Sequence, residues 1–256
     1  MNLDLWKRDF LHVWRASRRM AIVHSLLILV PVSLLVGLCV LVPLLSLILV
    51  PLLVVGSTAW WVQLHLAGYE AARDSSVRVG LFDRTEALRE NWKSLALGYA
   101  LWMALYMVGS IFVLPAFAVL ALLMPYFLFI AVEGKGPIEA LEANVRLAGD
   151  RIGEVMVFWL LMTVGMLGLA MPLIGVILGG LFMGGNAEGS TLLWVVVALT
   201  IPLMVGYSAV AYSIQVAVGV TSYRVLRGQT VDAIDENAFA MSGAVAASRE
   251  VDLVMW

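Results

Sequence analysis

The sequence has little charge and almost no cysteine. Aspartate, glutamate, lysine and arginine make up 13% of its 256 residues, whereas soluble domains carry about 25%. The one cysteine, Cys39, excludes an internal disulfide. The chain is instead apolar, since 62% of its residues are hydrophobic and the mean hydropathy is +0.96. This composition excludes an ordinary soluble domain and indicates an integral membrane protein.

Motifs for catalysis are also missing. The chain has no His-Glu-x-x-His, no Gly-x-Ser-x-Gly and no phosphate-binding Gly-Lys-Ser/Thr sequence. Its long apolar runs contain no aspartate, so they offer no aspartate pair for an intramembrane enzyme. We therefore expect a protein that is not an enzyme and has no cofactor and no metal. The basic residues are dispersed, which favours contacts with anionic lipids over nucleic-acid binding.

Six long apolar runs divide the chain, at about 21–42, 45–67, 95–114, 116–132, 155–182 and 192–222. A helix of about 20 apolar residues crosses a bilayer. All sixteen basic residues lie in connections that one orientation places on the same side. They are Lys7, Arg8, Arg15, Arg18, Arg19, Arg73, Arg78, Arg84, Arg89, Lys93, Lys135, Arg146, Arg151, Arg224, Arg227 and Arg249. The positive-inside rule then predicts six spans with both termini in the cytoplasm.

The expected fold is all-α, an integral membrane six-helix bundle built from three helical hairpins. Its outer connections are short, and Glu188 is the only charge predicted on that side. We expect a cytoplasmic amphipathic segment at 1–20, a membrane domain at 21–225 and a cytoplasmic tail at 226–256. A protein with so little exposed outside must act within the bilayer or on its cytoplasmic side.

Short amphipathic helices are predicted on the cytoplasmic side after hairpins one and two. In the first, Asp83 and Glu86 have the spacing of a capping box. In the second, Pro137 occupies a favoured first helical position and Gly149 fits a C-cap. The apolar stripe expected for the second helix is Ile138, Leu141, Val145 and Ala148. Both helices are expected to lie at the membrane surface or against the cytoplasmic ends of the spans.

These two helices share a sequence pattern, Glu-Ala-Leu-x-x-Asn-apolar-basic. The pattern aligns Glu86 and Asn91 of the first copy with Glu139 and Asn144 of the second. A weaker third copy occupies 232–237. The pattern predicts three repeats of a unit that consists of a hairpin and a short helix. Because Glu-Ala-Leu is also common helix-forming sequence, coincidence stays open. Asparagine is a poor helix former, so we expect it to hydrogen-bond the end of a neighbouring span.

The sequence resembles a group of uncharacterised bacterial inner-membrane families, including the YciC family and the membrane domain found with some glycerophosphodiester phosphodiesterases. The resemblance covers most of residues 20–225. It rests on Gly68-Tyr69, on Leu81-Phe82-Asp83 and on the acidic-Gly-x-Gly-x-x-Glu-Ala-Leu run from Glu133 to Leu141. Asn144 departs from the serine usual in that pattern. The resemblance implies a topology and the bacterial inner membrane, and it transfers no catalytic residue.

Polar residues near the cytoplasmic ends of the spans are the candidate site. In a hairpin that turns near Pro43, His24 comes opposite Gln63 and His65, and these residues with Glu70 form a predicted polar vestibule. Histidine titrates near neutral pH, so the vestibule suits a proton or an anion. Glu133 beside Lys135 is a second candidate, for an ion or a lipid headgroup. The alternative for all of them is ordinary polar residues at the membrane interface.

Glycines of the fifth span are candidates for close helix packing. Gly175 and Gly179 are four residues apart, and so are Gly180 and Gly184. This small-x-x-x-small spacing lets two helices approach closely in a membrane. The favoured function is accordingly a subunit, an assembly partner or a lipid-organising scaffold of a membrane complex, with membrane lipids and other membrane-protein subunits as partners. The alternative is a small-solute or lipid transporter or channel that uses the vestibule.

Overall fold

The computed structural model describes residues 3–41, 43–74, 89–109, 111, 125–183 and 190–230. Within these ranges every regular element is a helix, and no strand is present. The helices are α1 (Leu3–Leu41), α2 (Pro43–Arg73), α4 (Trp92–Gly109), α6 (Tyr126–Glu133), α7 (Pro137–Gly149), α8 (Ile152–Met183) and α9 (Ser190–Leu226). The all-α prediction is therefore confirmed for the described part of the chain.

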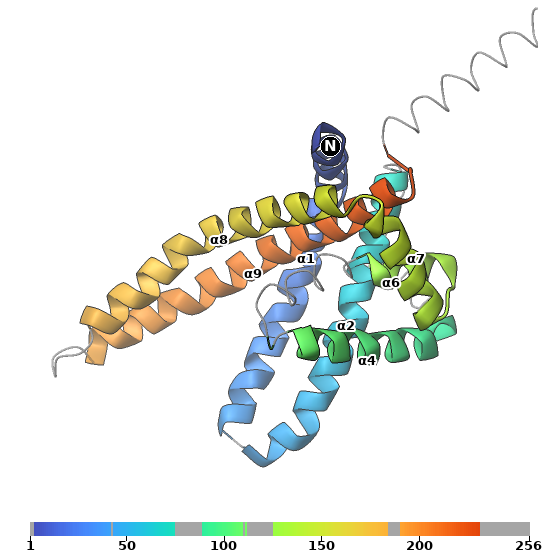
Figure 1. Cartoon of the computed structure of the whole chain (residues 1–256). Coiled ribbons are helices and arrows are strands. Elements are labelled where there is room, and N and C mark those ends of the chain that lie inside the picture. The colour runs from blue at the N-terminus through green and yellow to red at the C-terminus, as the bar shows by residue number, and fades with distance from the viewer. Residues whose placement is uncertain are drawn as a thin grey trace, which may run out of the picture.

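Two long hairpins, α1–α2 and α8–α9, dominate the arrangement (Figure 1). They diverge, since α1–α2 points down in this view and α8–α9 extends to the left, while α4, α6 and α7 lie beside α2. The described helices therefore form splayed hairpins, and they do not confirm the predicted six-helix bundle of three hairpins. The predicted fourth span lies largely outside the described residues, because α6 covers only its last part.

Two helical segments of the described chain are long and apolar enough to cross a membrane, Ile152–Gly175 and Pro202–Leu226. They belong to α8 and α9 and so correspond to the predicted fifth and sixth spans. This assignment rests on length and composition alone, and a buried core helix can meet the same criteria. The segment in α8 has only 17% of its residues buried, however, so it is no buried core helix.

Helix α1 is continuous across the boundary that we predicted between the N-terminal segment and the first span. It runs for 39 residues, because no proline or glycine interrupts the sequence near residue 20. Its first half is amphipathic. The buried residues recur every three or four positions and are Trp6, Asp9, Val13, Ser17 and Ala21. The exposed residues between them include Lys7, Arg8, Arg15, Arg18 and Arg19. This half of α1 packs along α9.

The core centres on the second half of α2, where every residue from 62 to 69 is buried. This segment packs against α1, α6 and α9 at once. Its closest approach is at Gly68, where an added Cβ would lie 2.6 Å from Cγ1 of Val216 in α9. Only a residue without a side chain allows the two helices to come this close.

The predicted surface helix after the second hairpin is α7. Pro137 is its first residue, as predicted, and the carboxylate of Glu139 accepts a hydrogen bond from the N–H of Gly136 at 3.4 Å. The helix ends at Gly149, but the C-cap is Asp150, in right-handed conformation with φ −65°. Gly149 therefore does not supply the left-handed cap that glycine favours.

The buried face of α7 differs from the predicted apolar stripe. It consists of Ala140, Ala143, Asn144 and Ala148. Ile138 and Val145, which we placed on the stripe, are 73% and 49% exposed. The prediction was wrong for Ile138 and Val145, whereas Ala148 is buried as predicted and Leu141 packs, partly buried, against the core. Small residues, rather than the two larger apolar ones, allow α7 to approach α4, α6 and α8.

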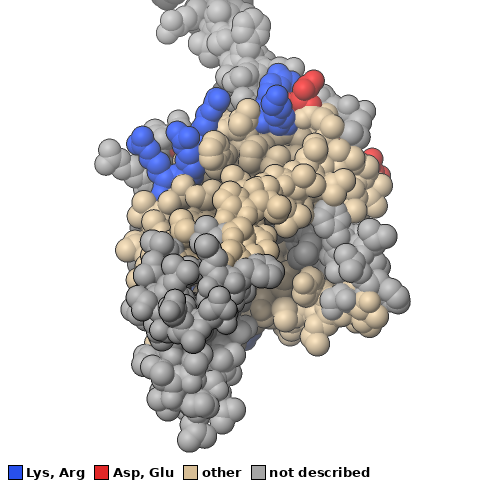
Figure 2. All heavy atoms as spheres, turned by 90° about the vertical axis from the view of Figure 1, so that its left-hand side faces the viewer, with Lys and Arg blue, Asp and Glu red and all other residues tan. Residues whose placement is uncertain are grey.

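The surface of the described chain is divided between charge and apolar side chains. Figure 2 shows the lysine and arginine side chains of one face gathered at its top, above a broad uncharged area. Among the residues whose exposure is described, α8 has the most exposed large apolar side chains. Its exposed side chains are Ile152, Leu160, Leu161, Val164, Leu167, Leu169, Met171, Ile174 and Leu178. A surface of this kind suits lipid or another apolar partner.

Candidate functional site

A buried ion pair joins α1 to α9. Arg224 donates from Nε and Nη2 to the carboxylate of Asp9 at 3.1–3.3 Å, and both side chains are 1% exposed. One turn away along α1, Trp6 donates to Glu154 of α8 at 2.9 Å and packs on Phe158. These contacts fix how α1 lies across the charged end of the α8–α9 hairpin.

Glu133 at the end of α6 is the centre of a second polar cluster. Its carboxylate accepts hydrogen bonds from Tyr223 at 2.8 Å and from Nε and Nη2 of Arg227, the first of these at 2.7 Å. Lys135 completes the cluster with Nζ 3.0 Å from the carboxylate. The predicted pairing of Glu133 with Lys135 is present, and Tyr223 and Arg227 were not predicted.

Aromatic rings surround this cluster. Phe129 lies under the cationic groups of Lys135 and Arg227, at 5.5 and 5.1 Å from the ring centre. Tyr223 packs edge-on against Phe129 and also against Tyr69, whose hydroxyl donates to Gln229 at 3.1 Å. Gly68-Tyr69 and the run that starts at Glu133 are two of the sequence segments singled out above. The structure brings these two segments together at the end of α9.

The environment of Glu133 favours its charged form. Burial raises the pKa of Glu133, whereas its hydrogen-bond donors and the charge of Arg227 lower it by more. The pKa therefore lies below its ordinary value of 4.5. The hydrogen bond to Glu133 in turn raises the pKa of Arg227. With both cations engaged on one carboxylate, the cluster acts as a link between α6, α9 and the start of α7.

The predicted vestibule residues do not converge on one cavity. Gln63 and His65 are both buried in α2, but positions two residues apart leave a helix in directions roughly 200° apart. The ring of His65 packs on Trp61, bonds its carbonyl at 2.8 Å and approaches the backbone of Gln215. Among the described residues, no hydrogen bond joins His24 to Gln63 or His65. Glu70 is half-buried one residue beyond Tyr69.

The predicted glycine face lies on the exposed side of α8. Nothing lies within 4 Å of a Cβ added at Gly175 or Gly179, so no described helix approaches them. Gly180 belongs to α8, while Gly184 lies outside the described residues. The described part of the chain therefore shows no close packing at Gly175 or Gly179, and packing of this face against a partner molecule stays a prediction. Among the described glycines, close helix contacts lie at Gly68 of α2 and Gly98 of α4 instead.

The two copies of the repeat differ where the asparagines lie. Asn144 is fully buried inside α7, whereas Asn91 forms a bend directly before α4 and its carbonyl accepts the N–H of Leu95 at 2.9 Å. Asn91 thus occupies an N-cap position, which asparagine favours. Glu139 caps α7 as described above. Glu86 and the third copy at 232–237 lie outside the described residues.

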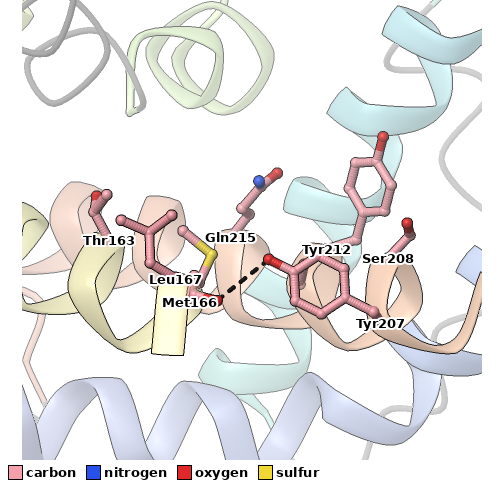
Figure 3. A pocket seen from close by; sticks show the side chains of 8 residues that line it. Thr163, Met166, Leu167, Tyr207, Ser208, Tyr212 and Gln215 are labelled. Carbon is pink, nitrogen blue, oxygen red and sulfur yellow. Dashed lines mark hydrogen bonds between the residues drawn. The ribbon is translucent and has the colours of Figure 1, made fainter. Parts of the chain in front are cut away.

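A groove between α8 and α9 was not predicted from the sequence. It has a volume of 390 Å³. Its lining consists of Thr163, Met166, Leu167, Tyr207, Ser208, Ala211, Tyr212 and Gln215. In Figure 3, Thr163, Ser208, Tyr212 and Gln215 rise from the same side of the hairpin. Tyr207 closes one wall, because its hydroxyl donates to the carbonyl of Met166 at 3.3 Å (Figure 3).

The groove escaped sequence analysis because none of its polar residues is charged. A search for charges within the apolar runs passes over serine, threonine, tyrosine and glutamine. Positions 207, 208, 211, 212 and 215 do follow the spacing of one helix face, which is the signal that could have found it. Tyr212 also packs edge-on against Trp60 of α2 at 5.1 Å, which ties the groove to the core.

The described residues contain no group of three or more histidine, cysteine, aspartate or glutamate side chains placed to hold a metal ion. Comparisons with models of known families, with curated proteins and with solved structures give no match.

Proposed function

We propose that this chain is a non-enzymatic, multi-pass protein of the bacterial inner membrane, with six spans and both termini in the cytoplasm. It acts as a subunit or assembly partner of a membrane complex, or as a lipid-organising scaffold. The family resemblance to YciC-like proteins belongs to the same proposal.

The observation that carries this proposal is the exposed apolar surface of α8. Large side chains such as Leu160, Val164 and Met171 are more than half exposed over a stretch that carries no charge. In water such a surface is unfavourable, since each Å² of apolar area exposed costs about 25 cal/mol. Lipid or another membrane helix removes this cost.

The distribution of charge supports the same reading. Two groups of charges lie where the two hairpins meet: the exposed basic side chains of α1 and the Glu133 cluster. The part of α8 far from this point has no charged side chain. A membrane orients a protein of this kind with its basic end in the cytoplasm. The transport alternative has less support, because Gln63 and His65 leave α2 in nearly opposite directions.

Crosslinking of native membranes followed by mild solubilisation tests the proposal. We expect the protein to migrate in a complex larger than its own mass and its detergent micelle. The pair of changes Gly175→Leu and Gly179→Leu, on the open face of α8, should weaken this complex. Gly206→Leu is the matched control, since Gly206 on α9 is equally open. Migration as a single chain after crosslinking would contradict the subunit role.

A further inference from the structure

The groove between α8 and α9 lies at a depth where water is scarce if the hairpin crosses the membrane, as the proposed function holds. Gln215 precedes Arg224 at the basic end of α9 by nine residues, or roughly 14 Å along the helix, and Ser208 precedes it by roughly 24 Å. The hydrocarbon layer is about 30 Å thick. The groove therefore opens into the interior of the bilayer.

Its polar side chains lack partners within the protein. In the described part of the chain, the side chains of Thr163, Ser208, Tyr212 and Gln215 make no hydrogen bond. Each is half-buried rather than fully exposed. A polar group without a hydrogen bond costs free energy in hydrocarbon. Four such groups on one concave wall favour a molecule that supplies the missing partners.

The chemistry of the wall restricts what this molecule is. Among the described residues, no carboxylate, ammonium or guanidinium group lines the groove, so a charged headgroup would find no counter-ion on this wall. The hydroxyls of Ser208 and Tyr212 and the amide of Gln215 donate hydrogen bonds to neutral oxygen atoms. Met166, Leu167 and Ala211 provide apolar contacts beside them. The volume of 390 Å³ falls in the range of small-molecule pockets.

We propose that this groove binds an uncharged, lipid-soluble molecule whose carbonyl or hydroxyl oxygens accept hydrogen bonds from Ser208, Tyr212 and Gln215. Neutral acylglycerols and quinones share this chemistry. The molecule enters sideways from the bilayer, because the wall residue Leu167 is 59% exposed. The groove is separate from the glycine face, since Thr163 and Gly175 lie roughly 120° apart around α8.

Photocrosslinking in reconstituted membranes tests this. The purified full-length protein is placed in phosphatidylcholine nanodiscs with one of three photoreactive probes: a diacylglycerol, a quinone or the anionic phosphatidylglycerol. Crosslinked peptides are then mapped. We expect a neutral probe to label the segments around 163–167 and 207–215, and its unlabelled counterpart to compete. Whichever neutral probe labels more strongly identifies the source of the ligand.

Variants make the result specific. Tyr212→Phe combined with Gln215→Leu removes two hydrogen bonds and should reduce the neutral labelling roughly tenfold. Thr163→Val on α8 is an independent, milder change and should reduce it severalfold. Ser213→Ala is the matched control on the same helix, because its hydroxyl already bonds the carbonyl of Val210 at 2.7 Å. Labelling of this control should stay within twofold of the unmodified protein.

Three outcomes would overturn the proposal. The groove variants could be labelled as strongly as the unmodified protein, or all three probes could label the whole exposed face of α8. The groove could also crosslink to another protein segment. Extraction of membranes with alkaline carbonate separates this failure from failure of the proposed function. A protein that stays in the membrane but takes no neutral probe at the groove loses only the ligand. A protein that is extracted loses the membrane role.

Discussion

The Asp9–Arg224 pair is a buried charge contact between α1 and α9, and it makes a prediction at the scale of single residues. Both side chains are 1% exposed, so replacing Asp9 leaves the charge of Arg224 buried without this carboxylate. Such losses cost about 3–5 kcal/mol, whereas replacing both partners with apolar residues is often neutral. We expect Asp9→Leu to be strongly destabilising and Asp9→Leu with Arg224→Met to recover most of the stability.

Unfolding of the detergent-solubilised protein measures both changes. Glu142→Gln on the exposed side of α7 serves as the control, with an expected effect below about 0.5 kcal/mol. A double variant no more stable than the single variant would contradict this account. It would mean that the pair provides a specific geometry which apolar packing cannot replace.

Glu133 makes a prediction about pH. Its pKa is lowered below 4.5, so its contacts stabilise the fold above the ordinary pKa, and this stabilisation is lost as the pH falls through the lowered value. Glu133→Gln should therefore lower the free energy of unfolding by about 1–2 kcal/mol near pH 7, because it removes hydrogen bonds to a charged carboxylate. The difference between the two proteins should shrink below pH 4.5.

Thermal unfolding of both proteins across this pH range provides the measurement, and Glu142→Gln is a control because Glu142 is exposed. A difference in stability that is the same at pH 7 and at low pH would show that shape, and not charge, explains the effect of Glu133. Glu133, Lys135 and Arg227 are all partly exposed, so the titration is accessible from the buffer.

Single residues were predictable where their partners were close in the chain. Glu133 and Lys135 are two positions apart, and the sequence alone paired them. Asp9 and Arg224 are 215 positions apart, and Tyr223 lies 90 positions from Glu133. No local pattern contains such pairings, because they depend on how the hairpins cross.

Helix packing at Gly68 gives a prediction at the scale of elements. An added methyl group would lie 2.6 Å from Val216, which forces α2 and α9 apart. We expect Gly68→Ala to destabilise the protein by about 1–3 kcal/mol, as overpacking does. Gly165→Ala on α8 meets nothing within 4 Å and should be neutral or slightly stabilising, since alanine favours helix.

Unfolding measurements on the two glycine variants decide between packing and backbone effects. Combining Gly68→Ala with Val216→Ala should restore part of the loss, because the shorter side chain makes room. If Gly68→Ala and Gly165→Ala behaved alike, the close approach of α2 and α9 would have no role in stability.

Elements were predicted better than their faces. Helix α7 begins at the predicted proline, yet its buried side carries alanines and Asn144 instead of Ile138 and Val145. Periodicity indicates which side of a helix is apolar, and either lipid or protein can cover an apolar side. The sequence therefore cannot tell a lipid-facing stripe from a packed one. The same ambiguity applies to the glycine face of α8, since nothing lies within 4 Å of a Cβ added at Gly175 or Gly179.

At the scale of the whole molecule, the described helices pack where the two hairpins cross. The second half of α2 is buried there, while the far end of α8–α9 has no described neighbour (Figure 1). Every membrane span must cross the same hydrocarbon layer. The sequence predicted a bundle because equal apolar lengths and alternate basic connections are compatible with parallel spans, but neither one specifies contacts between hairpins.

Topology therefore gives the decisive prediction for the molecule. In a Cys39→Ser background, single cysteines at Pro43, Ser190 and Gln229 report on the ends of the hairpins. Six spans require positions 43 and 190 to react with an impermeant maleimide from outside and position 229 from the cytoplasm. A reversed hairpin would carry arginines across the bilayer, at roughly 2.5–3.5 kcal/mol for each at its centre. Labelling of positions 190 and 229 from the same side would mean that the α8–α9 hairpin lies along the membrane and that its groove faces the interface instead of the hydrocarbon.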